Sequence, residues 1–176
     1  MSEQRTDDGD PLPTPERRGR VRRIAVPVVV TLAAVFVLMQ LVPYGWQHSN
    51  PPVINAAPWP DAASERIART SCYSCHSNET DWPWYSYVAP MSWLVRFDVD
   101  RGRDEFSFSD WDAGDADEAI EMIEAGEMPL GRFTLIHRDA RLTDDERATL
   151  IAALHLMGDQ RDGGGSDDRS GRGGGD

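Results

Sequence analysis

The sequence predicts a mostly helical protein, in which one membrane-spanning helix precedes a small domain of about three helices with long loops. Three observations predict this class. Residues 24–42 form an uncharged apolar run, the domain that follows has three segments with helical features, and no segment forms a convincing alternating strand. The alternating stretch EFSFSDW at residues 105–111 is too short to carry a sheet.

The length and charge of the chain limit its function. Its 176 residues allow one domain plus tails, since a domain commonly takes about 100 to 200 residues. All 18 basic residues are arginine, against 30 acidic residues, and the formal net charge is −12. Such a chain has no basic stripe to follow a phosphate backbone, so we expect no nucleic-acid partner, and its length excludes a large multidomain enzyme.

The first expected element is a membrane anchor at residues 24–42. These 19 residues carry no charge, and at about 1.5 Å per residue their helix nearly spans a hydrocarbon core of about 30 Å. The basic stretch RRGRVRR at residues 17–23 precedes the anchor, and no arginine lies between Val42 and Arg66. The positive-inside rule therefore places the Arg-rich residues 1–23 in the cytoplasm and the residues after Val42 outside.

A cleaved signal peptide is the alternative interpretation of this segment. Its apolar region is usually about 7 to 15 residues long and is followed at once by a small-x-small cleavage site. Here the apolar run is longer, and the nearest candidate site, NAAP at residues 55–58, lies well beyond it. We therefore expect an uncleaved single-pass anchor that binds the lipid bilayer of the cytoplasmic membrane.

The residues after the anchor divide into three parts. Residues 43–58 are rich in proline and predict an extended spacer between the bilayer and the domain. Residues 59–157 contain the apolar side chains of the folded domain. Residues 158–176 have nothing apolar to bury and predict a disordered Gly/Asp tail.

Three helices are expected in the domain, at residues 61–70, 115–125 and 143–157. The second begins with acidic residues and ends at Gly126, which suits a C-cap. Thr143 and Glu146 form a capping box at the start of the third, where apolar residues recur at helical spacing. Three short helices give a thin core, so we expect a disulfide, a metal or another non-protein core to complete it.

The two cysteines of the chain, Cys72 and Cys75, form the motif CYSCH with His76. A disulfide between them would close a very small loop and would leave the histidine unexplained. A thioredoxin-like redox pair needs a βαβ unit, which the sequence lacks. A structural zinc site would need a fourth ligand from another histidine, in no recognisable spacing. The other histidines outside the anchor are His48, His137 and His155.

The fourth interpretation of the motif is covalent attachment of one haem c per chain, which C-x-x-C-H indicates. Two thiols one helical turn apart can reach the two vinyl groups of one haem, and the adjacent histidine then lies under the iron as its proximal ligand. The motif also follows a membrane anchor, on the side where such attachment takes place. We therefore expect Cys72, Cys75 and His76 to bind haem, and keep the disulfide, redox-pair and zinc interpretations as alternatives.

The sixth ligand of the iron is expected from a loop. Met128 follows a helix that ends at Gly126 and precedes Pro129, whose fixed backbone angle stiffens the loop. A methionine held in this way can present its thioether to a buried iron. His137, in the stretch LIHRDARLT, is the alternative ligand.

Aromatic and basic residues near the motif are candidates for further contacts with haem. Trp82, Trp84, Tyr85 and Trp93 are large plates that can pack on a macrocycle and shield it from water. Arg101 and Arg103 can pair with the haem propionates through forked hydrogen bonds. Of the two arginines, Arg103 is the one that we include in the predicted site.

Two stretches of the sequence carry a resemblance to a known family. They are CYSCHSNETDWPWYSYVAPMSWLVRFDVDRGRDEFSFSDW at residues 72–111 and GEMPLGRFTLIHRDARLTDDE at residues 126–146. They resemble the bacterial membrane-anchored haem-binding domain family, whose members are small extracytoplasmic proteins with one c-type haem. The resemblance covers about residues 59–157 and implies that CYSCH is the haem site. It places Met128 where class I c-type cytochromes keep a ligand methionine, and leaves His137 open because it also lies in a family-like stretch.

Iron held by His76 and Met128 would have both axial positions filled, and thioether ligation raises the reduction potential. This combination favours a one-electron carrier with a redox partner protein in or near the membrane, rather than an enzyme. A haem sensor or peroxidase-like protein is the alternative, and it would need an open or exchangeable distal site.

Overall fold

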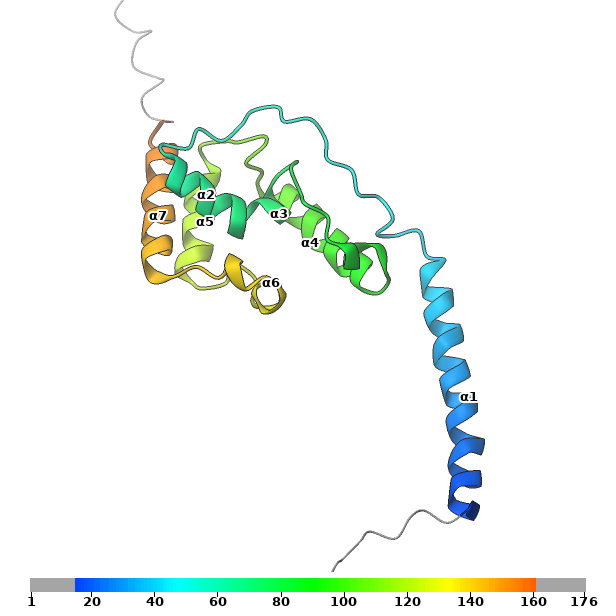
Figure 1. Cartoon of the computed structure of the whole chain (residues 1–176). Coiled ribbons are helices and arrows are strands. Elements are labelled where there is room, and N and C mark those ends of the chain that lie inside the picture. The colour runs from blue at the N-terminus through cyan, green and yellow to red at the C-terminus, as the bar shows by residue number, and fades with distance from the viewer. Residues whose placement is uncertain (1–14, 161–176) are drawn as a thin grey trace, which may run out of the picture. The chain divides into compact units, whose positions relative to one another are not determined.

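The computed structural model describes residues 15–160. Over this range the protein has seven α-helices and two 3-10 helices, and its β-structure is confined to two isolated bridges, so the predicted mostly helical class is confirmed. The chain divides after Pro43 into two units, of which the first carries α1 and the second all the other helices (Figure 1). The helices of the second unit are α2 (Ala62–Ser71), α3 (Tyr73–His76), η1 (Trp84–Tyr87), α4 (Met91–Glu105), α5 (Asp115–Glu124), α6 (Gly131–Ile136), η2 (Arg138–Ala140) and α7 (Asp144–Gly158).

The first unit contains α1 (Pro15–Gln40), which begins before the predicted anchor because it includes the arginine-rich stretch. Pro27 therefore lies inside the helix. Residues 22–40 have a mean hydropathy of 2.1 and are long and apolar enough to cross a membrane. A signal sequence shares these properties, so the anchor itself stays a prediction. The predicted disordered tail beyond residue 160 and the first 14 residues lie outside the described residues.

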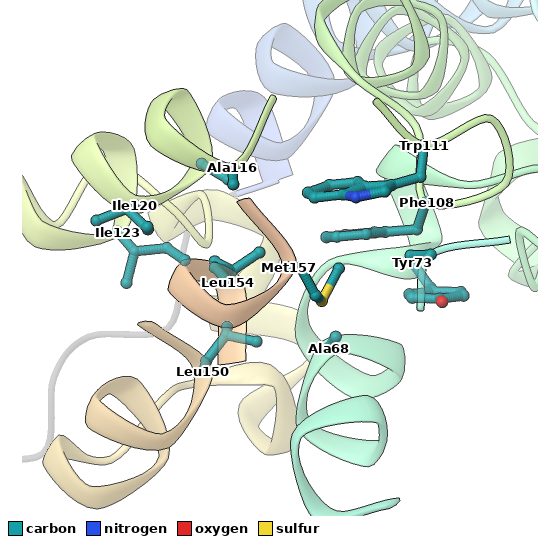
Figure 2. Close-up of a cluster of buried hydrophobic side chains, with 12 residues drawn as sticks. Ala68, Tyr73, Phe108, Trp111, Ala116, Ile120, Ile123, Leu150, Leu154 and Met157 are labelled. Carbon is teal, nitrogen blue, oxygen red and sulfur yellow. The ribbon is translucent and has the colours of Figure 1, made fainter. Parts of the chain in front are cut away.

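Three helices of the second unit, α2, α5 and α7, form its hydrophobic core. They match the three helices predicted from the sequence, and α7 begins with the predicted capping box between Thr143 and Glu146. α5 packs along α7, and α2 packs against α7 (Figure 1). The buried side chains of these helices meet the stacked rings of Tyr73, Phe108 and Trp111 (Figure 2).

The sequence did not indicate α3, α4 and α6, and α4 is the longest of these three. Its 15 residues begin after Pro90 with no side-chain cap, and they bury only Ser92, Val99 and Gly102 fully. A helix with so few buried apolar residues lacks the periodic pattern on which sequence-based prediction depends. α4 nevertheless packs against α3 and η1, so it forms one wall beside the CYSCH motif.

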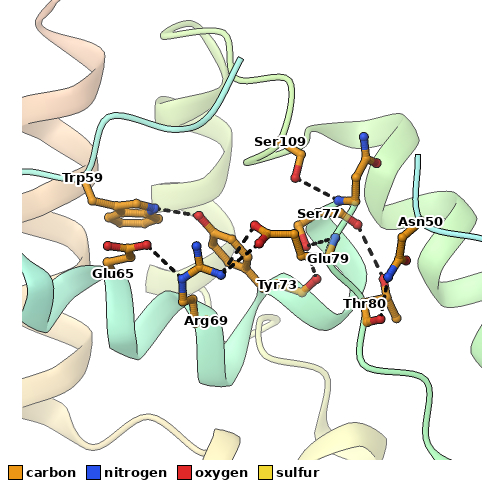
Figure 3. Close-up of polar contacts among 10 residues, drawn as sticks. Asn50, Trp59, Glu65, Arg69, Tyr73, Ser77, Glu79, Thr80 and Ser109 are labelled. Carbon is orange, nitrogen blue, oxygen red and sulfur yellow. Dashed lines mark hydrogen bonds and ion pairs between the residues drawn. The ribbon is translucent and has the colours of Figure 1, made fainter. Parts of the chain in front are cut away.

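The proline-rich segment, residues 44–59, is irregular but does not extend freely as a spacer. The backbone amides of Ile54 and Asn55 donate hydrogen bonds to the Ser109 carbonyl, at 2.8 and 3.0 Å, and the Ala57 amide donates to Phe108. Near its other end, the Asn50 side chain donates to the Thr80 carbonyl at 2.9 Å (Figure 3). Loops of the domain thus satisfy backbone groups that an irregular segment cannot satisfy by itself. We call residues 44–59 the strap.

Candidate functional site

The CYSCH motif lies at the junction of α2 and α3, coiled in a single helical turn. Cys72 ends α2, and its carbonyl accepts hydrogen bonds from the amides of Cys75 (3.1 Å) and His76 (2.9 Å). Neither cysteine is in a disulfide, and both are half-buried. The His76 carbonyl accepts from the Phe108 amide at 2.8 Å, which ties the motif to the loop after α4.

A cavity of about 570 Å³ opens beside this motif. Cys72, Cys75 and His76 line it from one side, while residues of α4, α5, α6, α7 and the α5–α6 loop complete the wall. Its volume lies in the range of roughly 300 to 1,000 Å³ that is typical of cofactor and ligand pockets. The lining is mostly apolar, as a large flat macrocycle requires.

The ring of His76 is fixed in a definite orientation. Its Nδ1 donates to the Phe106 carbonyl at 3.3 Å, and the ring stacks on Phe106 with centroids 4.1 Å apart. Burial lowers the pKa of His76, partly offset by the carbonyls of Phe106 and Gly102, so the neutral imidazole is favoured. A carbonyl on Nδ1 leaves Nε2 as the free nitrogen, which is the usual arrangement of a histidine that binds a metal.

The two thiols lack the properties of a redox-active pair. Burial raises the pKa of Cys72 to about 12 and that of Cys75 to about 11. A reactive thiol pair needs lowered values, because the thiolate is the nucleophile. Among the described residues, no group of three or more His, Cys, Asp or Glu side chains could hold a metal ion.

Gly102 brings α4 close to the motif. A Cβ atom at this position would lie 2.8 Å from the carbonyl oxygen of Cys75. Only glycine permits this approach, which brings the cavity-lining side chains of α4 next to the cysteines.

Met128 lines the same cavity as the CYSCH motif, on the loop between α5 and α6. α5 ends at Glu124, and two residues later Gly126 has a φ of +71°, in the left-handed region that commonly terminates helices. The amides of Glu127 and Met128 then donate to the Met122 carbonyl, at 3.0 and 3.2 Å, which fixes the loop. Met122 itself, on α5, also lines the cavity.

The alternative ligand, His137, is not among the cavity-lining residues. Its Nε2 lies 2.6 Å from the Tyr85 hydroxyl, and its ring stacks on Phe133 with centroids 4.4 Å apart. The nitrogen that would bind iron is thus already paired. The geometry favours Met128 over His137 as the residue that can reach a group in the cavity.

The structure does not bring the predicted tryptophan and tyrosine plates to the cavity. None of Trp82, Trp84, Tyr85 and Trp93 lines it. Trp82 contacts His48 and Asn50, and Trp84 is exposed. Tyr85 pairs with His137 as described above, and Trp93 is half-buried on α4.

Phenylalanines supply the aromatic lining instead, and sequence reasoning missed them. Phe97, Phe106, Phe108 and Phe133 all line the cavity, from α4, the following loop and α6. They are all the phenylalanines of the chain outside α1. The small number of phenylalanines was the one feature of the sequence that could have indicated their role. They are scattered over residues 97–133, however, whereas the tryptophans cluster next to the CYSCH motif.

Two arginines line the cavity, and Arg103 is not one of them. Arg101 pairs with Glu105 at 3.5 Å, and Arg132 forms a two-bond pair with Asp98 at 2.5 and 3.2 Å. Arg103 lies outside the lining and donates to the Ser77 carbonyl and to strap residues (Ser49 and Asn50). The paired thiols, the oriented imidazole, the apolar walls and two cavity-lining guanidiniums fit a haem with its propionates.

Comparisons with known proteins also indicate haem binding. Residues 34–155 match the model of a family described as a haem-binding domain. Cytochrome c peroxidase Ccp of Escherichia coli (strain K12) is 26% identical over 125 residues, which cover 62% of this chain and 27% of that protein. The chain therefore corresponds to only about a quarter of the length of this relative. No solved structure matches the chain.

Proposed function

Because the chain belongs to the haem-binding domain family, we propose that it is a membrane-anchored c-type haem protein that carries single electrons outside the cytoplasmic membrane. The observation that carries this proposal is the shared cavity. The CYSCH motif lines it from α2 and α3, and Met128 lines it from the α5–α6 loop. These residues would hold one haem there, with Cys72 and Cys75 as the covalent attachment and His76 and Met128 as ligands of its iron.

Cys72 and Cys75 would hold the haem covalently. Each S–H would add across one vinyl group, the sulfur bonding to one vinyl carbon and the hydrogen to the other, so that no oxidant is needed. The single turn that joins them also carries His76, so attachment fixes the histidine next to the iron. Nε2 of His76 is the proximal ligand in this proposal.

Met128 would be the distal ligand. The amides of Glu127 and Met128 both donate to the Met122 carbonyl and so fix the loop after α5. Met128 would therefore lose little further conformational freedom on binding the iron. The haem supplies reversible one-electron chemistry when bound, and His/Met ligation leaves no open position for a substrate. Phe97 and Phe133, which line the cavity, would help to exclude water from the macrocycle.

The membrane location in this proposal depends on α1. Its charge-free run follows five arginines between residues 17 and 23, and the residues after it contain no arginine until Arg66. The positive-inside rule then puts the second unit outside, where c-type haem attachment takes place and where a redox partner protein would meet it.

A second candidate function is peroxidase activity, favoured by the similarity to cytochrome c peroxidase Ccp. It would require that Met128 does not bind the iron. The cavity offers Arg101 and Arg132 as the basic groups for a bound peroxide, since His137 lies outside its lining.

Paired methionine variants test the proposal. Met128→Ala should remove the long-wavelength methionine band of the oxidised protein, lower the midpoint potential and allow carbon monoxide to bind to the reduced protein. The shift should be a sizeable part of the roughly 0.8 V range that axial ligands span. Met122→Ala is the matched control, because it removes another methionine from the wall of the same cavity. The long-wavelength methionine band should persist in this variant. Carbon monoxide binding by the unaltered protein would favour the peroxidase or sensor alternative.

A further inference from the structure

Four aromatic side chains of the strap and η1 are exposed, although the proposed electron-carrier function does not use them. Tyr44 and Trp46 belong to the strap and are 45% and 60% exposed. Trp84 and Tyr87 belong to η1 and are 79% and 63% exposed. We call these four residues the aromatic edge.

Contacts between the strap and η1 hold the aromatic edge together. The ring of His48 stacks on Tyr87, with centroids 3.9 Å apart and planes 14° apart. Nε2 of the same ring donates to the Ser86 carbonyl at 2.9 Å. The strap and η1, although far apart in the sequence, are therefore in contact through His48.

The start of the strap is also fixed to the first turns of α4. Gly45 has a φ of +88°, and a Cβ there would lie 2.7 Å from the carbonyl oxygen of Ser92. Two residues further on, the Gln47 carbonyl accepts a hydrogen bond from Arg96 at 3.2 Å. The strap is thus bound to the domain from Gly45 onward.

The two segments that form the aromatic edge carry no charge. Residues 43–60 and residues 82–95 contain no Asp, Glu or Arg, in a chain of which 27% is charged and which has no lysine. A surface that binds a charged redox partner would keep some charge for steering and specificity. Exposed tryptophan and tyrosine without charge are instead typical of the interfacial region of a bilayer.

Chain connectivity limits how far this edge can lie from the bilayer. Only residues 41–43 separate the end of α1 at Gln40 from Tyr44. Five peptide steps, from Gln40 to Gly45, span at most about 18 Å at about 3.6 Å per residue. A domain of about 100 residues has a radius of gyration of about 13 Å. The side of the domain opposite Gly45 therefore lies farther from the end of α1 than these five peptide steps can span.

We infer that the aromatic edge inserts its rings into the lipid headgroup layer of the same bilayer that α1 crosses. This inference rests on the proposed anchoring by α1. The second unit then rests on the membrane by η1 and the start of the strap, and redox partners approach it from its other faces.

Site-directed spin labelling of the haem-loaded full chain in phosphatidylcholine liposomes tests this inference. Trp46→Cys and Trp84→Cys each introduce one reactive thiol, since the native cysteines are consumed as thioethers. Each variant leaves three rings of the aromatic edge in place. Leu156→Cys, at an exposed position of α7, is the control in water, and Val30→Cys is the control in the anchor.

The measurement is the accessibility of each label to oxygen relative to a water-soluble nickel chelate. We expect this ratio to be several-fold higher at positions 46 and 84 than at position 156. Equal ratios at positions 46, 84 and 156, with position 30 in lipid, would overturn the inference and leave the anchor intact. A water-like ratio at position 30 would overturn the anchor as well, and protection of positions 46 and 84 from both reagents would show that protein covers the edge.

Discussion

Gly102 determines how closely α4 can approach the CYSCH motif. The obstacle to a side chain at this position is the backbone of Cys75, at 2.8 Å, and a backbone carbonyl cannot rotate away as a side chain can. A substitution would therefore move α4, with its cavity-lining residues, away from the cysteines.

Gly102→Ala should lower the free energy of unfolding by about 1 to 3 kcal/mol, the usual cost of overpacking, and should reduce the fraction of chains that carry haem. Intrinsic helix propensity works in the opposite direction, since alanine is favoured over glycine by about 1 kcal/mol. Denaturant unfolding and the haem-to-protein absorbance ratio measure the two effects. Gly131→Ala is the matched control on α6, because no heavy atom lies within 4 Å of its added Cβ, and it should leave both quantities unchanged or improved. Equal behaviour of the two variants would contradict the close approach of α4.

Arg103 and Arg101 differ in role although they are two residues apart. Arg103→Gln removes hydrogen bonds to Ser77 and to the strap, so it should lower the free energy of unfolding by about 1 to 2 kcal/mol and leave the midpoint potential unchanged. Arg101→Gln breaks only an exposed ion pair with Glu105, so stability should change by less than about 1 kcal/mol. The haem midpoint potential of the Arg101→Gln variant should fall, because a positive charge next to the haem would favour its reduced form. A lower potential in the Arg103 variant alone would restore Arg103 as the propionate partner that the sequence predicted.

The caps of α2 and α7 make folding stability depend on pH. The pKa of Asp61 is lowered by hydrogen bonds from Ser64 and Ala63 at the start of α2. The pKa of Glu146 is lowered by hydrogen bonds from Thr143 at the start of α7. Both carboxylates therefore stabilise the fold at pH values above their unfolded pKa values, and this stabilisation is lost as the pH falls through their lower folded values.

We expect the free energy of unfolding to decrease between neutral pH and about pH 3, below the ordinary carboxyl range of about 4. The double variant Asp61→Asn, Glu146→Gln should be less stable at neutral pH and should lose less on acidification. Chemical denaturation at several pH values measures this. The exposed Asp144→Asn serves as a control on α7 and should follow the unaltered protein. Parallel curves for the double variant and the unaltered protein would contradict the role of the caps.

The helices differ in how far the sequence could predict them. α2, α5 and α7 have acidic first turns or caps and apolar faces that enter the core, so pattern and capping agree. α4 has no acidic first turn, no side-chain cap and no apolar face in the core. It packs through Gly102 and forms a wall of the cavity instead. Its packing depends on Cys75, a contact across more than 20 residues that no local pattern encodes.

The candidate site was predictable where its residues are neighbours in the sequence. Cys72, Cys75 and His76 lie in one turn, and Met128 follows a helix end marked by Gly126. The aromatic lining was not predictable, because nearness in sequence suggested the tryptophans of residues 82–93, whereas η1 carries Trp84 outward. The phenylalanines reach the cavity only through the packing of α4, α6 and the loop between α4 and α5.

As a whole molecule, the protein combines a helix able to cross a membrane with a small helical unit that contains the cavity beside the CYSCH motif. Buried side chains of α5 and α7 line that cavity together with the CYSCH motif and residues of α4. A haem in the cavity would join these parts and supply apolar contacts that a unit of this size does not make by itself.

Intact mass spectrometry of the purified chain, made in cells that attach haem c and unfolded before measurement, tests the central proposal most directly. We predict a mass equal to the polypeptide plus one haem, retained under denaturing conditions, and its loss when Cys72 and Cys75 are both replaced by alanine. A colourless product with the mass of the polypeptide alone would contradict the account.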